Sequence, residues 1–138
     1  MKSQSLLIAI DVYLDMIYYC DVEKLDAIFH PASSLFDADE GKIVVDPIAH
    51  FRQDVANRPS PASANQKREE EVILIDYLSP LSAVVKLRLR SHDNIFVDHL
   101  SFVKDDNNEW KIVAKVWHLE STFKHGSKEA SKQVMNDH

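Results

Sequence analysis

The stretch IFVDHLSFVK, residues 95–104, points to the fold class because large apolar side chains recur at every second position. A period of two is typical of a β-strand with one buried face. That face would carry Phe96, Asp98, Leu100 and Phe102. The carboxyl group of Asp98 therefore lies among apolar side chains, where it needs a partner or is pushed toward its neutral form.

Three further stretches have strand character: residues 71–78, 82–91 and 110–120. Short polar segments separate the four strands, namely Ser79-Pro80, Asp93-Asn94 and residues 105–109. Connections of this length join antiparallel neighbours, so the second half of the chain is expected to form an antiparallel meander.

The residues upstream follow a helical period instead. One amphipathic helix over the first twenty residues is predicted by Leu6, Ile10, Tyr13, Leu14 and Ile17. Asp21 can cap a second helix, which His30 ends and Pro31 stops. Asp46 followed by Pro47 predicts the start of a third helix, with the Asp46 carboxylate as its cap.

The order of these elements defines the architecture. Residues 34–37 and 42–45 flank Gly41 and predict a small hairpin, and residues 59–66 predict a loop within one domain. Helices followed by strands indicate an α+β protein, with three N-terminal helices packed on a strongly curved antiparallel sheet. We expect one cone-shaped domain over residues 1–120, a pocket between sheet and helices, and a polar C-terminal tail over residues 121–138.

Three motifs lie in this order: Phe29-His30-Pro31, FVDHL at 96–100 and WKIVAKVW at 110–117. Together with the order of elements over about residues 5–120, they resemble the nuclear-transport-factor-2-like (NTF2-like) superfamily, and within it the branch named putative lumazine-binding. The resemblance implies a cystatin-like cone that is shared with ketosteroid isomerases and SnoaL-like polyketide cyclases. It leaves the function open, because this fold hosts many chemistries.

The resemblance also implies positions for an active site. Relatives with isomerase activity hold a tyrosine on the first helix as oxyanion donor, an aspartate base near the first strand, and a protonated acid on a central strand. Tyr13 matches the first position and Asp37 the second, and Asp98 matches the third if the loop 105–109 is longer than in those relatives. The acidic turn 38–41 is expected to hold Asp37 in water as a weak base, which argues against steroid-type proton transfer.

The composition excludes several classes of function. Two glycines in 138 residues, where about 7% is average, leave no glycine-rich phosphate loop. A net charge of −6 argues against a nucleic-acid partner. The single Cys20 allows no internal disulfide, and the apolar run 6–10 is too short for a membrane span or a secretory signal. We expect a cytoplasmic protein with no cofactor, nucleic-acid partner or membrane association.

Three residues are candidate catalytic groups: Asp98 and His30 as acid or base, and Tyr13 as the donor to an oxyanion. Each has a structural alternative. Asp98 can form a hydrogen bond with a tyrosine of the first helix or a salt bridge with Arg68. His30 can bond to carbonyl groups at the end of the second helix.

The candidate ligand contacts form a larger set: Tyr13, Phe29, His30, Asp37, Phe51, Arg68, Phe96, Asp98 and Trp117. Their aromatic rings can line a cavity for a flat ligand or pack the core. Lys104, Lys115 and Arg68 can meet an anionic ligand group, although a lysine more often lies on a solvated face. The histidines show no spacing typical of a metal site, and no metal is expected.

The last strand predicts a partner. Alternation from Trp110 puts Ile112, Ala114 and Val116 on one face, and Val113, Trp117 and Leu119 on the other beside Lys111 and Lys115. Because helices can cover only one face of the sheet, we expect a homodimer through the open sheet face.

Three functions fit these observations. The first is binding of a small, partly aromatic molecule in the pocket. The second is an acid/base enzyme of the isomerase, dehydratase or cyclase type on the same scaffold. The third is a noncatalytic dimeric module whose pocket is filled by side chains.

Overall fold

The computed structural model describes residues 5–123. Its helices are α1 (Leu6–Tyr19), α2 (Val22–Ile28), α3 (Ile48–Asn57) and a short 3-10 turn, η1 (Ala62–Ala64). Its strands are β1 (Phe29–Asp37), β2 (Val44–Pro47), β3 (Glu70–Ser79), β4 (Ser82–Ser91), β5 (Asn94–Lys104) and β6 (Trp110–Thr122). The predicted bounds of the four long strands are confirmed to within two residues. β6 takes up the start of the predicted tail, and residues 124–138 lie outside the described part of the chain.

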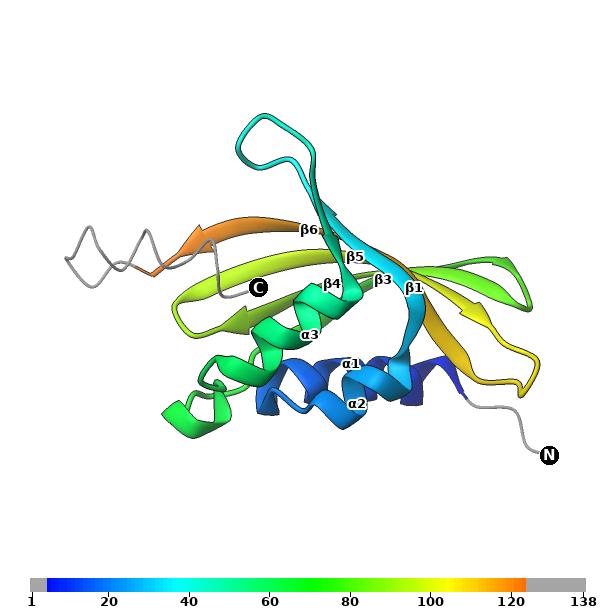
Figure 1. Cartoon of the computed structure of the whole chain (residues 1–138), viewed down its shortest axis with the longest axis horizontal. Helices are drawn as coiled ribbons and strands as arrows, with labels where there is room; N and C mark the ends of the chain where they lie inside the picture. Colours follow the sequence, from blue (N-terminus) through cyan, green and yellow to red (C-terminus); the bar gives the residue numbers. More distant parts are fainter. Residues whose placement is uncertain (1–4, 124–138) are drawn as a thin grey trace.

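All six strands belong to one sheet in the order β2-β1-β6-β5-β4-β3. The meander from β3 to β6 is antiparallel as predicted, whereas β1 runs parallel to β6. The sheet is therefore mixed rather than wholly antiparallel, because β1 joins the free edge of the meander after α2. The three helices lie together on one face of the curved sheet and leave the other face open (Figure 1).

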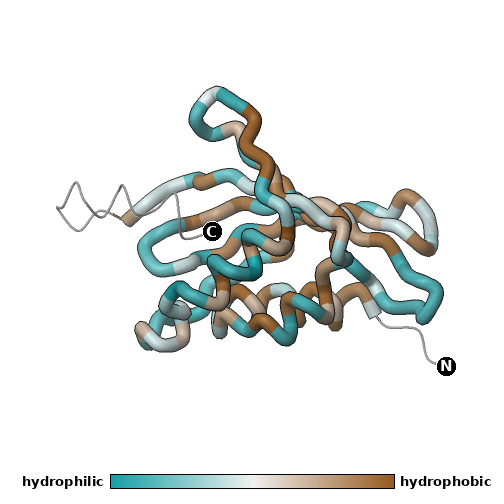
Figure 2. The backbone as a smooth tube through the Cα atoms, in the orientation of Figure 1, coloured by the Kyte–Doolittle hydropathy of each residue, from teal (hydrophilic) through white to brown (hydrophobic). Residues whose placement is uncertain are grey.

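The core lies between the helices and the inner face of the sheet. Its helical side is the buried stripe of α1, which consists of Leu6, Ala9, Ile10, Tyr13, Leu14, Met16 and Ile17. Along β4 and β5, buried residues alternate with half-buried ones with few breaks, and the buried residues form the inner face. Some apolar residues lie outside this core: the hairpin of β1 and β2 projects from the molecule and carries the exposed side chains Ile43 and Val45 (Figure 2).

Two helix boundaries differ from the prediction. Phe29 ends α2 with extended backbone angles, so His30 and Pro31 lie in β1 and not at a helix end. Pro31 is tolerated there because the pairing of β1 with β6 is interrupted between Phe29 and Ser34, where a missing N–H costs no ladder bond. Pro47 is the N-cap residue of α3 and makes no side-chain cap, so the prediction of an Asp46 cap was wrong.

A β-bulge in β6 changes which side chains face the core. Ser101 pairs with Ala114 and Phe102 with Ile112, so Val113 is an extra residue in β6. Before the bulge Ile112 is buried, and after it Lys115 is buried. Continuous alternation from Trp110 therefore assigned the wrong face to the residues beyond Val113.

The bulge also changes the evidence for a dimer. Trp117 and Leu119 pack against the core instead of lying on the open face. Val116 takes their place there and is 50% exposed.

The cap of α2 provides a test of this local structure. The Asp21 carboxylate accepts hydrogen bonds from the backbone N–H groups of Glu23 and Lys24, at 3.0 and 3.2 Å. Asp21→Ala removes both, so its free energy of unfolding in urea should fall by about 1 kcal/mol. Asp21→Asn keeps an acceptor at the cap, so its free energy of unfolding should fall by only a few tenths of a kcal/mol. Equal losses in the two variants would show that the cap does not stabilise the helix.

Candidate functional site

Three polar side chains from three different elements meet inside the apolar core. The Tyr13 hydroxyl on α1 donates a hydrogen bond to Asp98 Oδ2 on β5, at 2.6 Å. Lys115 Nζ on β6 lies 3.8 Å from the same carboxylate oxygen. None of the three residues has any solvent-exposed surface. We call Tyr13, Asp98 and Lys115 the polar triad.

The positions of the triad follow from the periodicity of each element. Tyr13 belongs to the buried stripe of α1, and Asp98 to the inner face of β5. In the ladder between β5 and β6, Asp98 pairs with Trp117 and Leu100 pairs with Lys115. Asp98 and Lys115 are therefore diagonal neighbours on one face, which is within reach of a lysine side chain.

Aromatic rings surround the lysine end of the triad. Lys115 Nζ lies 4.9 Å from the ring centre of Phe51 and 5.3 Å from that of Tyr13. The Phe29 ring contacts both of these rings, with centres 6.1 and 6.2 Å apart. Cation–π attraction partly replaces the hydration that the ammonium loses on burial.

The electrostatics of the triad follow from burial and from charge. Burial lowers the pKa of Lys115 to about 8, although the nearby Asp98 carboxylate opposes the shift; the Arg58 charge lowers it further. Burial and then the Asp98 charge raise the pKa of Tyr13 well above its usual value, so its hydroxyl stays protonated as a donor. Among the residues that the structure describes, Lys115 Nζ has no hydrogen-bond partner.

Most of the predicted aromatic contacts share this interior. Phe29 and Phe51 lie beside the triad, and Phe96 packs edge-on against Trp117 with ring centres 5.8 Å apart. The predicted hydrogen bond between Asp98 and a tyrosine of the first helix is present, whereas Asp98 makes its ion pair with Lys115 and not with Arg68.

Three of the predicted contacts lie apart from the triad. His30 is exposed on β1, and its Nδ1 accepts a hydrogen bond from the Ala32 N–H. Asp37 is only 7% exposed at the end of β1, so the acidic turn does not hold it in water; burial raises its pKa.

Arg68 is engaged by two surface carboxylates. It forms ion pairs of 2.8 Å with Asp15 and 2.7 Å with Glu70, and its guanidinium lies over the Tyr18 ring. These partners leave Arg68 little capacity for a ligand.

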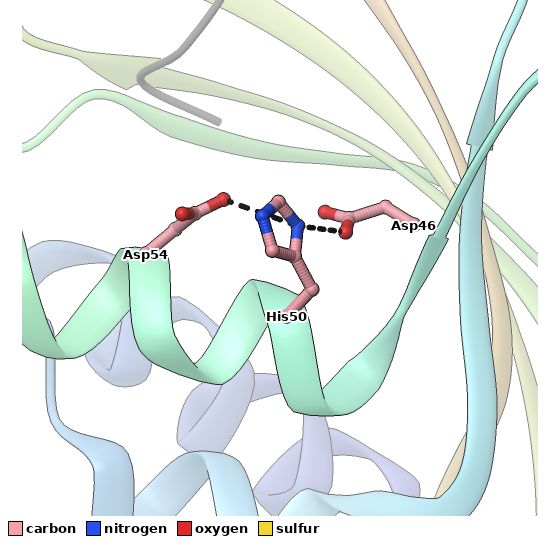
Figure 3. A group of neighbouring side chains, drawn as sticks. All are labelled: Asp46, His50 and Asp54. Atoms are coloured by element: carbon pink, nitrogen blue, oxygen red, sulfur yellow. Dashed lines mark hydrogen bonds and ion pairs between the residues drawn. The ribbon is translucent and has the colours of Figure 1, made fainter.

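The histidine group that sequence reasoning missed lies on the surface of α3. Figure 3 shows the His50 ring between the carboxylates of Asp46 and Asp54. His50 Nδ1 is hydrogen-bonded to Asp46 and lies 3.8 Å from Asp54, and these partners raise the pKa of His50. The spacing of four residues between His50 and Asp54 is a recognisable signal for an ion pair on a helix, whereas Asp46 lies in β2. These ion pairs explain why the three side chains lie together, with one oxygen or nitrogen atom of each within 4.8 Å of the others.

The outer face of the sheet carries a hollow of about 310 Å³. Its lining is mostly charged or imidazole-bearing: Lys86, Arg88, Val97, His99, Val116, Trp117, His118 and Glu120. Asp98 and Lys115 of the polar triad lie on the opposite face of β5 and β6. Within residues 5–123, no helix combines the length and the apolar character needed to cross a membrane.

Three helices on one face of a six-stranded mixed sheet give the chain an NTF2-like α+β fold. The chain is similar to an NTF2-like protein of unknown function from Shewanella baltica, with 17% identity and a TM-score of 0.73 over 84% of this chain and 91% of that one. A ketosteroid isomerase-like protein from Erwinia carotovora atroseptica is 12% identical, with a TM-score of 0.62 over 83% and 92% of the two chains.

The sequence itself narrows the class. Residues 2–118 match the family described as putative lumazine-binding, and the chain belongs to that family. None of the curated proteins compared with the chain matches it significantly.

The burial of Lys115 predicts a pH dependence. With a pKa of about 8 in the folded chain and 10.5 as the ordinary value, only the unfolded chain binds this proton between those two pH values. The stability contribution of Lys115 should therefore rise with pH in this window, by at most about 1.4 kcal/mol for each pH unit.

Urea unfolding of the wild-type chain and of Lys115→Met between pH 7 and 10 measures this contribution. The wild-type chain should gain stability relative to the variant as the pH rises. Lys42→Met removes an exposed lysine from the turn between β1 and β2 and serves as the control. If the free energies of unfolding of the wild-type chain and Lys115→Met differ by the same amount at every pH, that result would contradict burial of the Lys115 ammonium away from water.

Proposed function

We propose that this protein binds a small, partly aromatic molecule in the interior between the sheet and the helices. The observation that carries the proposal is the buried Lys115 ammonium, whose N–H groups have no acceptor among the described residues. A fully buried donor without an acceptor is costly and rare in native proteins. An oxygen atom of a bound ligand would satisfy this donor.

The surroundings of Lys115 suit an aromatic ligand. The rings of Tyr13, Phe29 and Phe51 form one continuous group beside the ammonium. Aromatic rings favour edge-to-face or offset contacts with a flat ligand, and a few polar groups among apolar walls are typical of small-molecule sites.

Binding requires part of the cover to move, because Tyr13, Phe51, Asp98 and Lys115 are all closed to solvent. The helix α3 has the smallest buried share of the three helices, since Phe51 and Val55 are the buried residues among its ten. A change of rotamer at Phe51, without displacement of the whole helix, would move its ring away from the triad and leave room for a ligand ring.

An acid/base enzyme is the second candidate, favoured by the 2.6 Å hydrogen bond between the fully buried Tyr13 and Asp98 side chains. In this arrangement the Tyr13 hydroxyl proton is already used in the hydrogen bond to Asp98. Lys115 is then the donor for a developing oxyanion and Asp98 the base.

We also propose a homodimer through the open face of the sheet. The helices leave that face uncovered, and Val97 and Val116 lie on it beside the hollow described above. Arg88 and Glu120 in the same hollow already form an ion pair of 2.9 Å within one chain, so a second copy related by two-fold symmetry would be held mainly by contacts between the valines.

Binding is tested with lumazine and 2-naphthamide as probes, using thermal shift and titration calorimetry. At a concentration of 100 Kd, a ligand adds about 2.7 kcal/mol to the stability, which raises the Tm by several degrees. Lys115→Met should weaken binding about tenfold, because a hydrogen bond to a charged group is lost. Lys42→Met, at an exposed position in the turn between β1 and β2, should bind as the wild-type chain does. Failure of both probes to raise the Tm, or equal binding by Lys115→Met, would contradict the proposal.

The dimer is tested by light scattering after size exclusion at micromolar concentration. The expected mass is twice the 15.8 kDa of one chain. Val116→Arg puts a charge into the proposed interface and should give monomers. Leu78→Arg, at a position that is 89% exposed on the edge strand β3, should remain dimeric. A monomeric wild-type chain, or equal disruption by both substitutions, would rule out this interface.

A further inference from the structure

A second cation whose charged end is buried without a hydrogen-bond partner in the described part of the chain lies at the end of α3. Arg58 is the C-cap residue of that helix. Both terminal nitrogens of its guanidinium, Nη1 and Nη2, are buried and have no hydrogen-bond partner among the described residues. These two atoms carry four of the five N–H donors of an arginine.

Arg58 and Lys115 share one aromatic neighbour. The guanidinium carbon of Arg58 lies 5.6 Å from the ring centre of Phe51, and Lys115 Nζ lies 4.9 Å from the same centre. The charge of Arg58 also acts on the pKa values of both Tyr13 and Lys115. The guanidinium is therefore within electrostatic reach of the polar triad.

The charges in this region do not balance. Lys115 and Arg58 contribute two positive charges, and within residues 5–123 the carboxylate that forms an ion pair with either of them is that of Asp98. The other carboxylate that acts on Lys115 is Asp46, which is already bonded to His50. One further negative charge would neutralise the two cations and give their N–H groups an acceptor.

We propose that the ligand of this interior carries a carboxylate, which accepts hydrogen bonds from Arg58 and Lys115 while its ring packs against the aromatic group. The inference rests on the proposed function and names the chemical class of the molecule. A carboxylate fits because an arginine fork binds its two oxygens in one plane, and because charge-assisted hydrogen bonds are strongest where water is excluded.

Two isosteric probes, 2-naphthoate and 2-naphthamide, separate the charge from the ring. Calorimetry on the wild-type chain should give a Kd for 2-naphthoate at least tenfold lower than that for 2-naphthamide. Arg58→Met keeps the aliphatic stem without the charge. It should abolish this preference and change the Kd for 2-naphthamide less than twofold.

Arg52→Met is the matched control, because Arg52 lies on the same helix in a surface ion pair of 2.8 Å with Asp26. It should keep the full preference. Arg58→Lys retains the charge but not the fork, and an intermediate preference is expected; this variant carries the test if Arg58→Met does not fold.

Equal affinities of the wild-type chain for the two probes would overturn the carboxylate inference and leave the proposed binding function intact. A preference that survives in Arg58→Met would overturn it as well. Failure of both probes to bind the wild-type chain would overturn the carboxylate inference and count against the binding function itself, whose own test includes lumazine.

Discussion

The burial of the Asp98 carboxylate inside an apolar cone is the constraint on which the rest of the structure depends. A carboxylate without any exposed surface must be hydrogen-bonded and paired. Its partners come from two other elements, because Tyr13 on α1 donates to it and Lys115 on β6 supplies the opposite charge. The helix α1 and the strand β6 are thereby held in one position relative to β5, since removing one partner of a buried pair typically costs about 3–5 kcal/mol.

Features that depend on neighbouring residues could be predicted from the sequence, whereas features that depend on contacts between distant segments could not. Alternation in residues 82–91 and 95–104 predicted β4 and β5 because both strands keep one register from end to end. The parallel pairing of β1 with β6 joins segments about eighty residues apart, and no local pattern reports it. His30 was misplaced because Pro31 was interpreted as a helix stop, while in the structure it lies in an interrupted strand.

The position of Lys115 shows why the rest of the site escaped prediction. Trp110 and Ile112 face the core from even-numbered positions of β6. Beyond the bulge, Trp117 and Leu119 face the core from odd-numbered positions. Apolar residues on both faces were interpreted as a sign of a partner, whereas they mark a bulge at Val113 that shifts the phase. Arg58 gave no signal at all, because its burial depends on how α3 packs over the sheet.

Among residues 5–123, three buried nitrogens, one of Lys115 and two of Arg58, have no hydrogen-bond acceptor. The fold is shared by proteins of many functions, so the function has to be argued from these side chains. The most direct measurement is a crystal structure of the chain with 2-naphthoate. Carboxylate oxygens are expected within hydrogen-bond distance of Lys115 Nζ and the Arg58 guanidinium, with the Phe51 ring turned away from the triad. Electron density for the ligand only in the hollow of the outer face, with the interior still closed, would contradict this expectation.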